Sequence, residues 1–207
     1  MNYIKTAFGI LFHPMDTLYT IKQNRTKLKL LTGPVFFILL FAVRILFVFT
    51  VHAPLAALRP EDANLFYELG KIVFLIVVWS VSAFAVSCIF SGESTFKENF
   101  IAIVYCTVPY LMFTLPLAAF SRILTLSESS LFNGIESFIF IWVGFLLFLS
   151  VKQLNGYTLG KSILVCLVIL FCFAVICAAL ILFVSLFGNL SGFISGLMTE
   201  FLLKINS

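Results

Sequence analysis

Charged side chains inside apolar sequence are the first residues here that could do chemistry. Arg44 lies in an apolar run, about seven residues before its end at Val51. A charge at such a position in a membrane is costly, so it is usually paired, or its long side chain reaches the headgroups. Glu136 and Glu68, near the starts of later apolar runs, are both within reach as partners. We expect a structural pair or snorkelling; the alternative is a role in moving an ion or a substrate.

A stripe of hydroxyl groups is the second candidate. The hydroxyls recur every seven residues, at Thr107, Thr114 and Ser121. Tyr110 lies on the same side of a helix. Pro109 and Pro116 interrupt this stretch, and each lacks the N–H that would bond the carbonyl four residues earlier. We predict that the hydroxyls help to satisfy those carbonyls, which belong to Tyr105 and Met112.

Two interpretations of this polar face remain open. Both turn it toward the interior of a helical bundle. In the first, the prolines produce a bent packing helix; in the second, they form a hinge or line a cavity. The second would give a transport path lined by Arg44, Thr107, Tyr110 and Thr114.

The remaining reactive residue types exclude several classes of site. The cysteines all fall in apolar stretches without a CxxC spacing: Cys88, Cys106, Cys166, Cys172 and Cys177. The two histidines, His13 and His52, lie far from them in the sequence. We therefore expect no metal site, no disulfide framework and no cofactor. Motifs for phosphate binding, serine hydrolysis or zinc proteolysis are also missing, so no catalytic residue is predicted.

The composition indicates that lipid surrounds most of the chain. Of 207 residues, 62% are hydrophobic and 11% are charged, and the mean hydropathy is +1.15. Soluble domains average roughly 45–50% apolar and 25% charged residues. We predict an all-α, polytopic membrane bundle. The net charge of +4 is explained by topology, so nucleic acid is not an expected partner.

Five stretches are long and apolar enough to cross a bilayer as helices, which needs about 20 residues each. They are residues 30–51, 70–90, 100–121, 132–154 and 162–187. The third is preceded by Thr95 and Glu98, which have the spacing of a capping box. We divide the chain into a basic segment, 1–29, a five-span domain, 30–187, and a tail, 188–207.

The basic residues predict the orientation, because lysine and arginine favour the cytoplasmic side. Eight flank the spans on the N-terminal side of the membrane: Lys5, Lys22, Arg25, Lys27, Lys29, Lys97, Lys152 and Lys161. Four lie on the other side: Arg59, Lys71, Arg122 and Lys204. We predict a cytoplasmic N-terminus and a C-terminus outside.

Both ends of the chain have amphipathic patterns. In residues 1–29, Ile4, Phe8, Leu11, Met15 and Leu18 recur at helical spacing, and Pro14 favours a helix start. We expect one or two short helices on the cytoplasmic leaflet. The tail carries a stripe from Leu190 to Ile205. Because Gly188-Asn189 precedes it, we predict a break there and a second surface helix.

Several short motifs resemble those of the bacterial branch of the Yip1 domain family. They are residues 12–17 (FHPMDT), Ile21-Lys22, Trp79, residues 91–98 (SGESTFKE), residues 105–111 (YCTVPYL) and residues 156–161 (GYTLGK). The resemblance covers nearly the whole chain and implies a five-helix membrane protein with a cytoplasmic N-terminus. Eukaryotic relatives act in vesicle trafficking with Rab-type GTPases. They carry a longer hydrophilic N-terminal region, whereas this chain has a short basic segment.

The resemblance implies a bacterial plasma-membrane protein of unassigned activity. From the residues we infer a non-enzymatic scaffold or accessory subunit, with the bilayer and either itself or another membrane protein as partners. The alternative is a small transporter or channel lined by the kinked face of the third span. The candidate functional or packing residues are Arg44, Thr107, Pro109, Tyr110, Thr114, Pro116 and Glu136.

Overall fold

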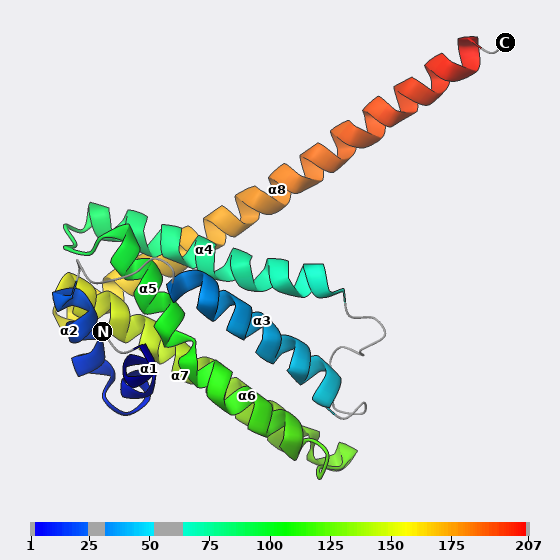
Figure 1. Cartoon of the computed structure of the whole chain (residues 1–207). Helices are drawn as coiled ribbons and strands as arrows, with labels where there is room; N and C mark the ends of the chain where they lie inside the picture. Colours follow the sequence, from blue (N-terminus) through cyan, green and yellow to red (C-terminus); the bar gives the residue numbers. More distant parts are fainter. Residues whose placement is uncertain (1–2, 25–31, 52–63, 206–207) are drawn as a thin grey trace.

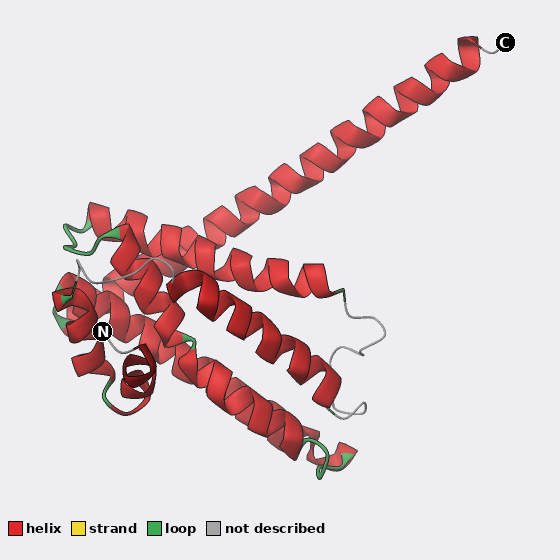
Figure 2. Ribbon diagram, viewed as in Figure 1, coloured by secondary structure: helices red, strands yellow, loops and turns green. Residues whose placement is uncertain are grey.

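The computed structural model describes residues 3–24, 32–51 and 64–205, with side chains left undescribed at some positions inside helices, chiefly beyond Phe193. Within these ranges every regular element is helical (Figure 2). The basic residues Arg25, Lys27, Lys29 and Arg59 lie outside the described residues.

The elements follow in this order: α1 (Tyr3–Phe12), α2 (Pro14–Gln23), α3 (Thr32–Thr50), α4 (Leu65–Ile89), α5 (Phe96–Cys106), α6 (Val108–Phe120), the 3-10 helix η3 (Leu126–Glu128), α7 (Ser129–Asn155) and α8 (Leu159–Ile205). In the described ranges, five stretches could cross a membrane: Gly33–Thr50, Phe66–Ile89, Phe96–Phe120, Ser129–Asn155 and Leu159–Leu190. The predicted fold class and span number are confirmed.

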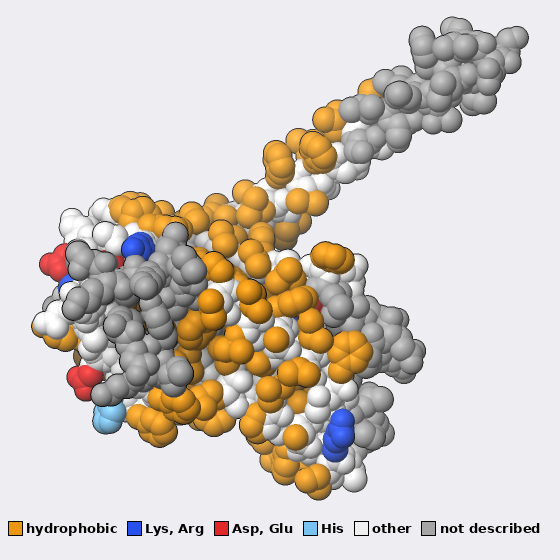
Figure 3. Space-filling view, in the orientation of Figure 1, with side chains coloured by type: hydrophobic (Ala, Val, Ile, Leu, Met, Phe, Trp, Pro, Cys, Tyr) orange, Lys and Arg blue, Asp and Glu red, His pale blue; other side chains and the backbone are white. Residues whose placement is uncertain are grey.

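The surface supports a lipid environment. Hydrophobic side chains cover the middle of the bundle and the shaft of α8, whereas most visible charged groups lie near α1 and α2 or at the opposite end (Figure 3). Such a large exposed apolar area is typical of a membrane protein and would cause a soluble monomer to associate.

The core lies toward the end of the bundle that holds α1 and α2 (Figure 1). There α5 is central, because its residues from Ile101 to Cys106 are all buried. They pack against Phe36 and Leu40 of α3 and Leu146 of α7. The chain is therefore tightly packed at this end, while α4 diverges from α3 toward the other (Figure 1), where Phe47 of α3 still packs against Leu117 of α6.

Two short N-terminal helices form as predicted, but only part of the predicted stripe faces the core. Leu18 of the stripe is fully buried together with Ile10 and Ile21, whereas Phe8 and Met15 of the stripe are exposed. The reason is the turn at His13, where Pro14 starts α2 and folds it back on α1. Both helices then contribute to one buried surface. Their predicted position on the membrane surface stays a prediction.

The break predicted at Gly188-Asn189 is wrong, because α8 runs unbroken from Leu159 to Ile205. Glycine costs a helix interior only about 1 kcal/mol relative to alanine, and asparagine less. In apolar surroundings each helical hydrogen bond is worth more than that, because no water replaces it. The predicted boundary between the five-span domain and the tail therefore falls inside one helix, which points away from the bundle (Figure 1).

Candidate functional site

Arg44 of α3 and Glu68 of α4 form an ion pair. The Arg44 Nε donates to the Glu68 Oε2 at 2.9 Å. The other carboxylate oxygen, Oε1, lies 2.5 Å from the Lys71 Nζ, one turn further along α4. Glu68 is only 4% exposed, so its charge is compensated by two cations and not by solvent. Of the two predicted partners of Arg44, the structure selects Glu68 over Glu136.

These groups line a cavity of about 270 Å³, which we call the charged cavity. Thr107 and Tyr110 also line it, at the junction of α5 and α6. The Tyr110 side chain interacts with the Arg44 guanidinium. Apolar residues of α3, α4 and α7 complete the walls: Leu40, Ile72, Leu75, Ile76, Phe140 and Val143. The structure thus brings together three of the predicted site residues, Arg44, Thr107 and Tyr110.

The third span is interrupted at Thr107, as the prolines predict. α5 begins with the predicted capping box, in which the Thr95 N–H donates to the Glu98 Oε2 at 2.9 Å and the Glu98 N–H to the Thr95 Oγ1 at 3.4 Å. It ends at Cys106, and Pro109 falls in the first turn of α6. There a missing N–H costs little, because helix starts leave such groups unbonded. Pro116 lies inside α6 without ending it.

The hydroxyl stripe points inward, but its hydrogen bonds differ from the prediction. Thr114 and Ser121 are buried. The hydroxyls donate to other carbonyls than those of Tyr105 and Met112: Thr107 to Val104, Thr114 to Tyr110 and Ser121 to Ala118. A side-chain hydroxyl reaches carbonyls three or four residues back on its own helix most easily, and this local geometry explains the difference.

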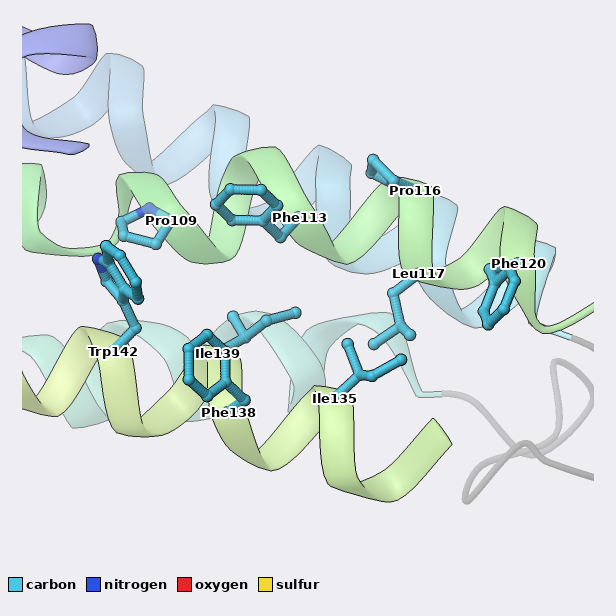
Figure 4. A pocket seen from close by; sticks show the side chains of 9 residues that line it. All are labelled: Pro109, Phe113, Pro116, Leu117, Phe120, Ile135, Phe138, Ile139 and Trp142. Carbon is cyan, nitrogen blue, oxygen red and sulfur yellow. The ribbon is translucent and has the colours of Figure 1, made fainter. Parts of the chain in front are cut away.

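Pro109 and Pro116 belong to a second, apolar cavity of about 410 Å³ between α6 and α7 (Figure 4). Pro109 lies beside Trp142 at one end, and Leu117 points toward Ile135 at the other (Figure 4). Thr114 and Glu136 line neither cavity. Four of the predicted site residues, Pro109, Thr114, Pro116 and Glu136, therefore do not line the charged cavity.

A hydrogen-bonded cluster that sequence reasoning missed lies at the end of the bundle near α1 and α2. We call it the polar junction: Ser87, Ser94, Asn99, Asn155 and Tyr157. The Asn155 Oδ1 accepts from the Ser94 N–H at 3.2 Å, and its Nδ2 donates to the Ser87 Oγ at 3.2 Å. The Asn99 Nδ2 donates to the Ser94 Oγ at 3.1 Å. The loop after α4 is thereby joined to the end of α7.

Tyr157 and Gly92 complete this junction. The Tyr157 hydroxyl contacts the carbonyls of Ser87 and Phe90 at 3.4 Å each. Burial raises the pKa of the Tyr157 phenol. A Cβ at Gly92 would collide with the Tyr157 hydroxyl and Asn155 side chain, so only glycine fits. Gly92 and Tyr157 both occur in motifs quoted for the family resemblance, but nothing in the sequence indicated that the two residues meet.

An ion pair also joins the second N-terminal helix to the loop beside this junction. The Lys22 Nζ of α2 lies 2.8 Å from the Glu93 Oε2, in the loop that follows α4. Among the described residues no three His, Cys, Asp or Glu side chains group as metal ligands do. The charged cavity therefore combines charged and hydroxyl groups with apolar walls, whereas the polar junction consists of side chains that are hydrogen-bonded to one another.

A family model described as Yip1 domain matches residues 8–183. The match begins within α1 and ends within α8, so it includes all five spans in whole or in part. No curated protein and no solved structure matches the chain.

Proposed function

Because the chain belongs to the Yip1 domain family and is an integral, multi-pass membrane protein, we propose that it is a non-enzymatic scaffold or accessory subunit. It acts through helix–helix contacts with itself or with another membrane protein. The observation that carries the proposal is the exposed distal part of α8.

α8 has two different parts. Near its start, Val165 and Ile169 are fully buried against Ala83 and Val86 of α4. Further along, from residue 181 to 187, the large apolar side chains are 65–70% exposed: Ile181, Leu182, Phe183, Val184, Leu186 and Phe187. The part beyond residue 183 also lies outside the family match.

From Ala174 onward, α8 carries small residues on one face. They are spaced by multiples of about one helical turn: Ala174, Ala178, Ser185, Gly188 and Gly192. Such spacing places them on one side of a helix, opposite Val165 and Ile169. A Cβ added at Gly188 or Gly192 would meet no atom within 4 Å. In lipid, small residues let a second helix approach closely enough for backbone packing, so this face suits a partner helix.

Single-cysteine crosslinking in native membranes tests the proposal. The five native cysteines are first replaced by serine or alanine. Ala178→Cys and Ser185→Cys then probe the small-residue face, and Phe183→Cys probes the opposite face. Ile141→Cys, on the exposed side of α7, controls for random collision. We expect adducts mainly from the small-residue face, and their mass identifies a second copy or another protein. Equal yields at all four positions would refute the proposal.

The chain also has a predicted orientation and location. We propose a cytoplasmic N-terminus, a C-terminus outside, and residence in a bacterial plasma membrane. The excess of lysine and arginine on the N-terminal side supports this arrangement. Labelling with an impermeant reagent tests it, in the single-cysteine variants Gly160→Cys and Thr125→Cys, whose positions lie just beyond opposite ends of α7. Only Thr125→Cys should react in intact cells.

The alternative function, a small transporter, has the charged cavity in its favour. However, the interior of the bundle between this cavity and the helices α1 and α2 is packed. Ile101, Val104 and Tyr105 of α5 are buried there. A cavity with a packed floor is better suited to holding a group than to passing one. We therefore keep the scaffold as the proposed function.

A further inference from the structure

The charged cavity has an excess of positive charge. Two cations, Arg44 and Lys71, line it, against one carboxylate, Glu68. The ion pairs therefore leave one positive charge without a matching negative charge among the lining residues. An uncompensated cation is costly in the membrane, so an anion bound in this cavity would be stabilised. We propose that the charged cavity binds the headgroup phosphate of an anionic phospholipid.

The depth of the cavity fits a phosphate. Arg44 lies six residues before the end of α3 at Thr50, and Lys71 six residues after the start of α4 at Leu65. At 1.5 Å per residue, both are about 9 Å from the helix ends. Those ends lie on the same side of the membrane, because one short connection joins α3 to α4. Long cationic side chains reach the headgroup level from such a depth.

The cations retain donors for a phosphate. A guanidinium has five N–H donors and an ammonium has three. The contact with Glu68 uses the Nε of Arg44 and one donor of Lys71. Arginine and lysine are the side chains that most often bind phosphate, the first through its planar fork and the second as a point charge. Since Lys71 is 47% exposed, an approaching headgroup has access to it.

The walls of the cavity fit a lipid and not a free ion. Leu40 and Ile76 form a buried apolar floor, and Leu75 and Phe140 at the rim are 59% and 54% exposed. An acyl chain can lie along these exposed side chains while the phosphate meets Lys71. The volume of about 270 Å³ is slightly below the roughly 300–1,000 Å³ of pockets that enclose a whole small molecule. It therefore holds a headgroup and leaves the tails in the bilayer.

Native mass spectrometry of the full chain in neutral detergent tests this site. The chain is mixed with equal amounts of palmitoyl-oleoyl phosphatidylglycerol and phosphatidylcholine, and the bound lipids are counted. We expect phosphatidylglycerol to be preferred. A cation near an anionic headgroup contributes about 1 kcal/mol, so Lys71→Gln should lower the preference about fivefold. Lys71→Arg keeps the charge and should keep the preference.

Lys22→Gln is the matched control, because Lys22 also forms an ion pair, 2.8 Å from Glu93, at the other end of the bundle. It should lower the preference clearly less than Lys71→Gln does, because Lys22 does not line the charged cavity. Equal binding of the two lipids by the native chain would overturn the proposal. So would an equal effect of the two lysine variants. If inorganic phosphate displaced the bound phosphatidylglycerol, a soluble anion would be the ligand and the lipid assignment would be wrong.

Discussion

Replacing Glu68 by glutamine removes the charge to which both Arg44 and Lys71 bind, while it keeps the size of the side chain. The buried carboxylate accepts from Arg44 at 2.9 Å and lies 2.5 Å from the Lys71 Nζ. Hydrogen bonds to charged groups stabilise a fold by about 1.5–3 kcal/mol each. The bond to Lys71 contributes less, about 0–1 kcal/mol, because Lys71 is half exposed. We therefore expect Glu68→Gln to lower the free energy of unfolding by about 3 kcal/mol.

The assay is reversible unfolding in mixed micelles of a mild detergent and dodecyl sulfate, followed by circular dichroism. Glu136→Gln is the matched control. Glu136 is also a glutamate near the start of a span; its charge acts on Tyr110, but the ion pair joins Arg44 to Glu68. This control should change the free energy of unfolding by no more than about 0.5 kcal/mol, as substitutions outside such contacts usually do.

A double-mutant cycle tests whether Arg44 and Glu68 interact directly. If Arg44 and Glu68 interact directly, Arg44→Gln should cost less in the Glu68→Gln background, with a coupling energy of about 2 kcal/mol. Additive effects of the two substitutions, or equal destabilisation by Glu68→Gln and Glu136→Gln, would show that the reasoning from burial and geometry is mistaken.

Two further predictions concern the polar junction. Gly92→Ala should lower the unfolding midpoint markedly, at a cost of about 1–3 kcal/mol, because a Cβ there would meet the Ser87 carbonyl oxygen at 2.9 Å. Gly134→Ala, where a Cβ meets nothing within 4 Å, should be neutral or stabilising; equal effects would contradict the close packing. Because burial raises the pKa of Tyr157 in the folded chain, folding favours the protonated phenol. Stability from this group is then complete below about pH 10, the ordinary tyrosine value, and is lost as pH rises further. Tyr157→Phe should lose part of this alkaline decrease in the unfolding midpoint, and an unchanged pH dependence would argue against it.

Most of the fold could be predicted because it depends on local signals. The length of an apolar run determines whether a helix can cross the bilayer. The capping box of Thr95 and Glu98 involves residues three apart, and Pro109 acts on its own helix. Each of these features was therefore visible in the sequence, and each is present in the structure.

The candidate site was only partly predictable, because it depends on distances between helices. Arg44 had two reachable glutamates, and the choice of Glu68 follows from the packing of α3 against α4. Asn155 gave no signal of its own, since its partners are 61 and 68 residues away. The break at Gly188-Asn189 failed for another reason. Residues of low helix propensity end a helix only if other hydrogen-bond partners are present for the backbone N–H and C=O groups that the break would expose.

The apolar part of α8 is longer than the hydrocarbon layer of a membrane is thick. The apolar stretch from Leu159 to Leu190 has 32 residues and is about 48 Å long at 1.5 Å per residue, against about 30 Å of hydrocarbon. A straight rod of this length remains within the hydrocarbon only at about 50° from the membrane normal. Its far end then lies about 37 Å to the side of its near end, by the same geometry. In a thinner bilayer the same rod would have to tilt further, and its lateral reach would be longer.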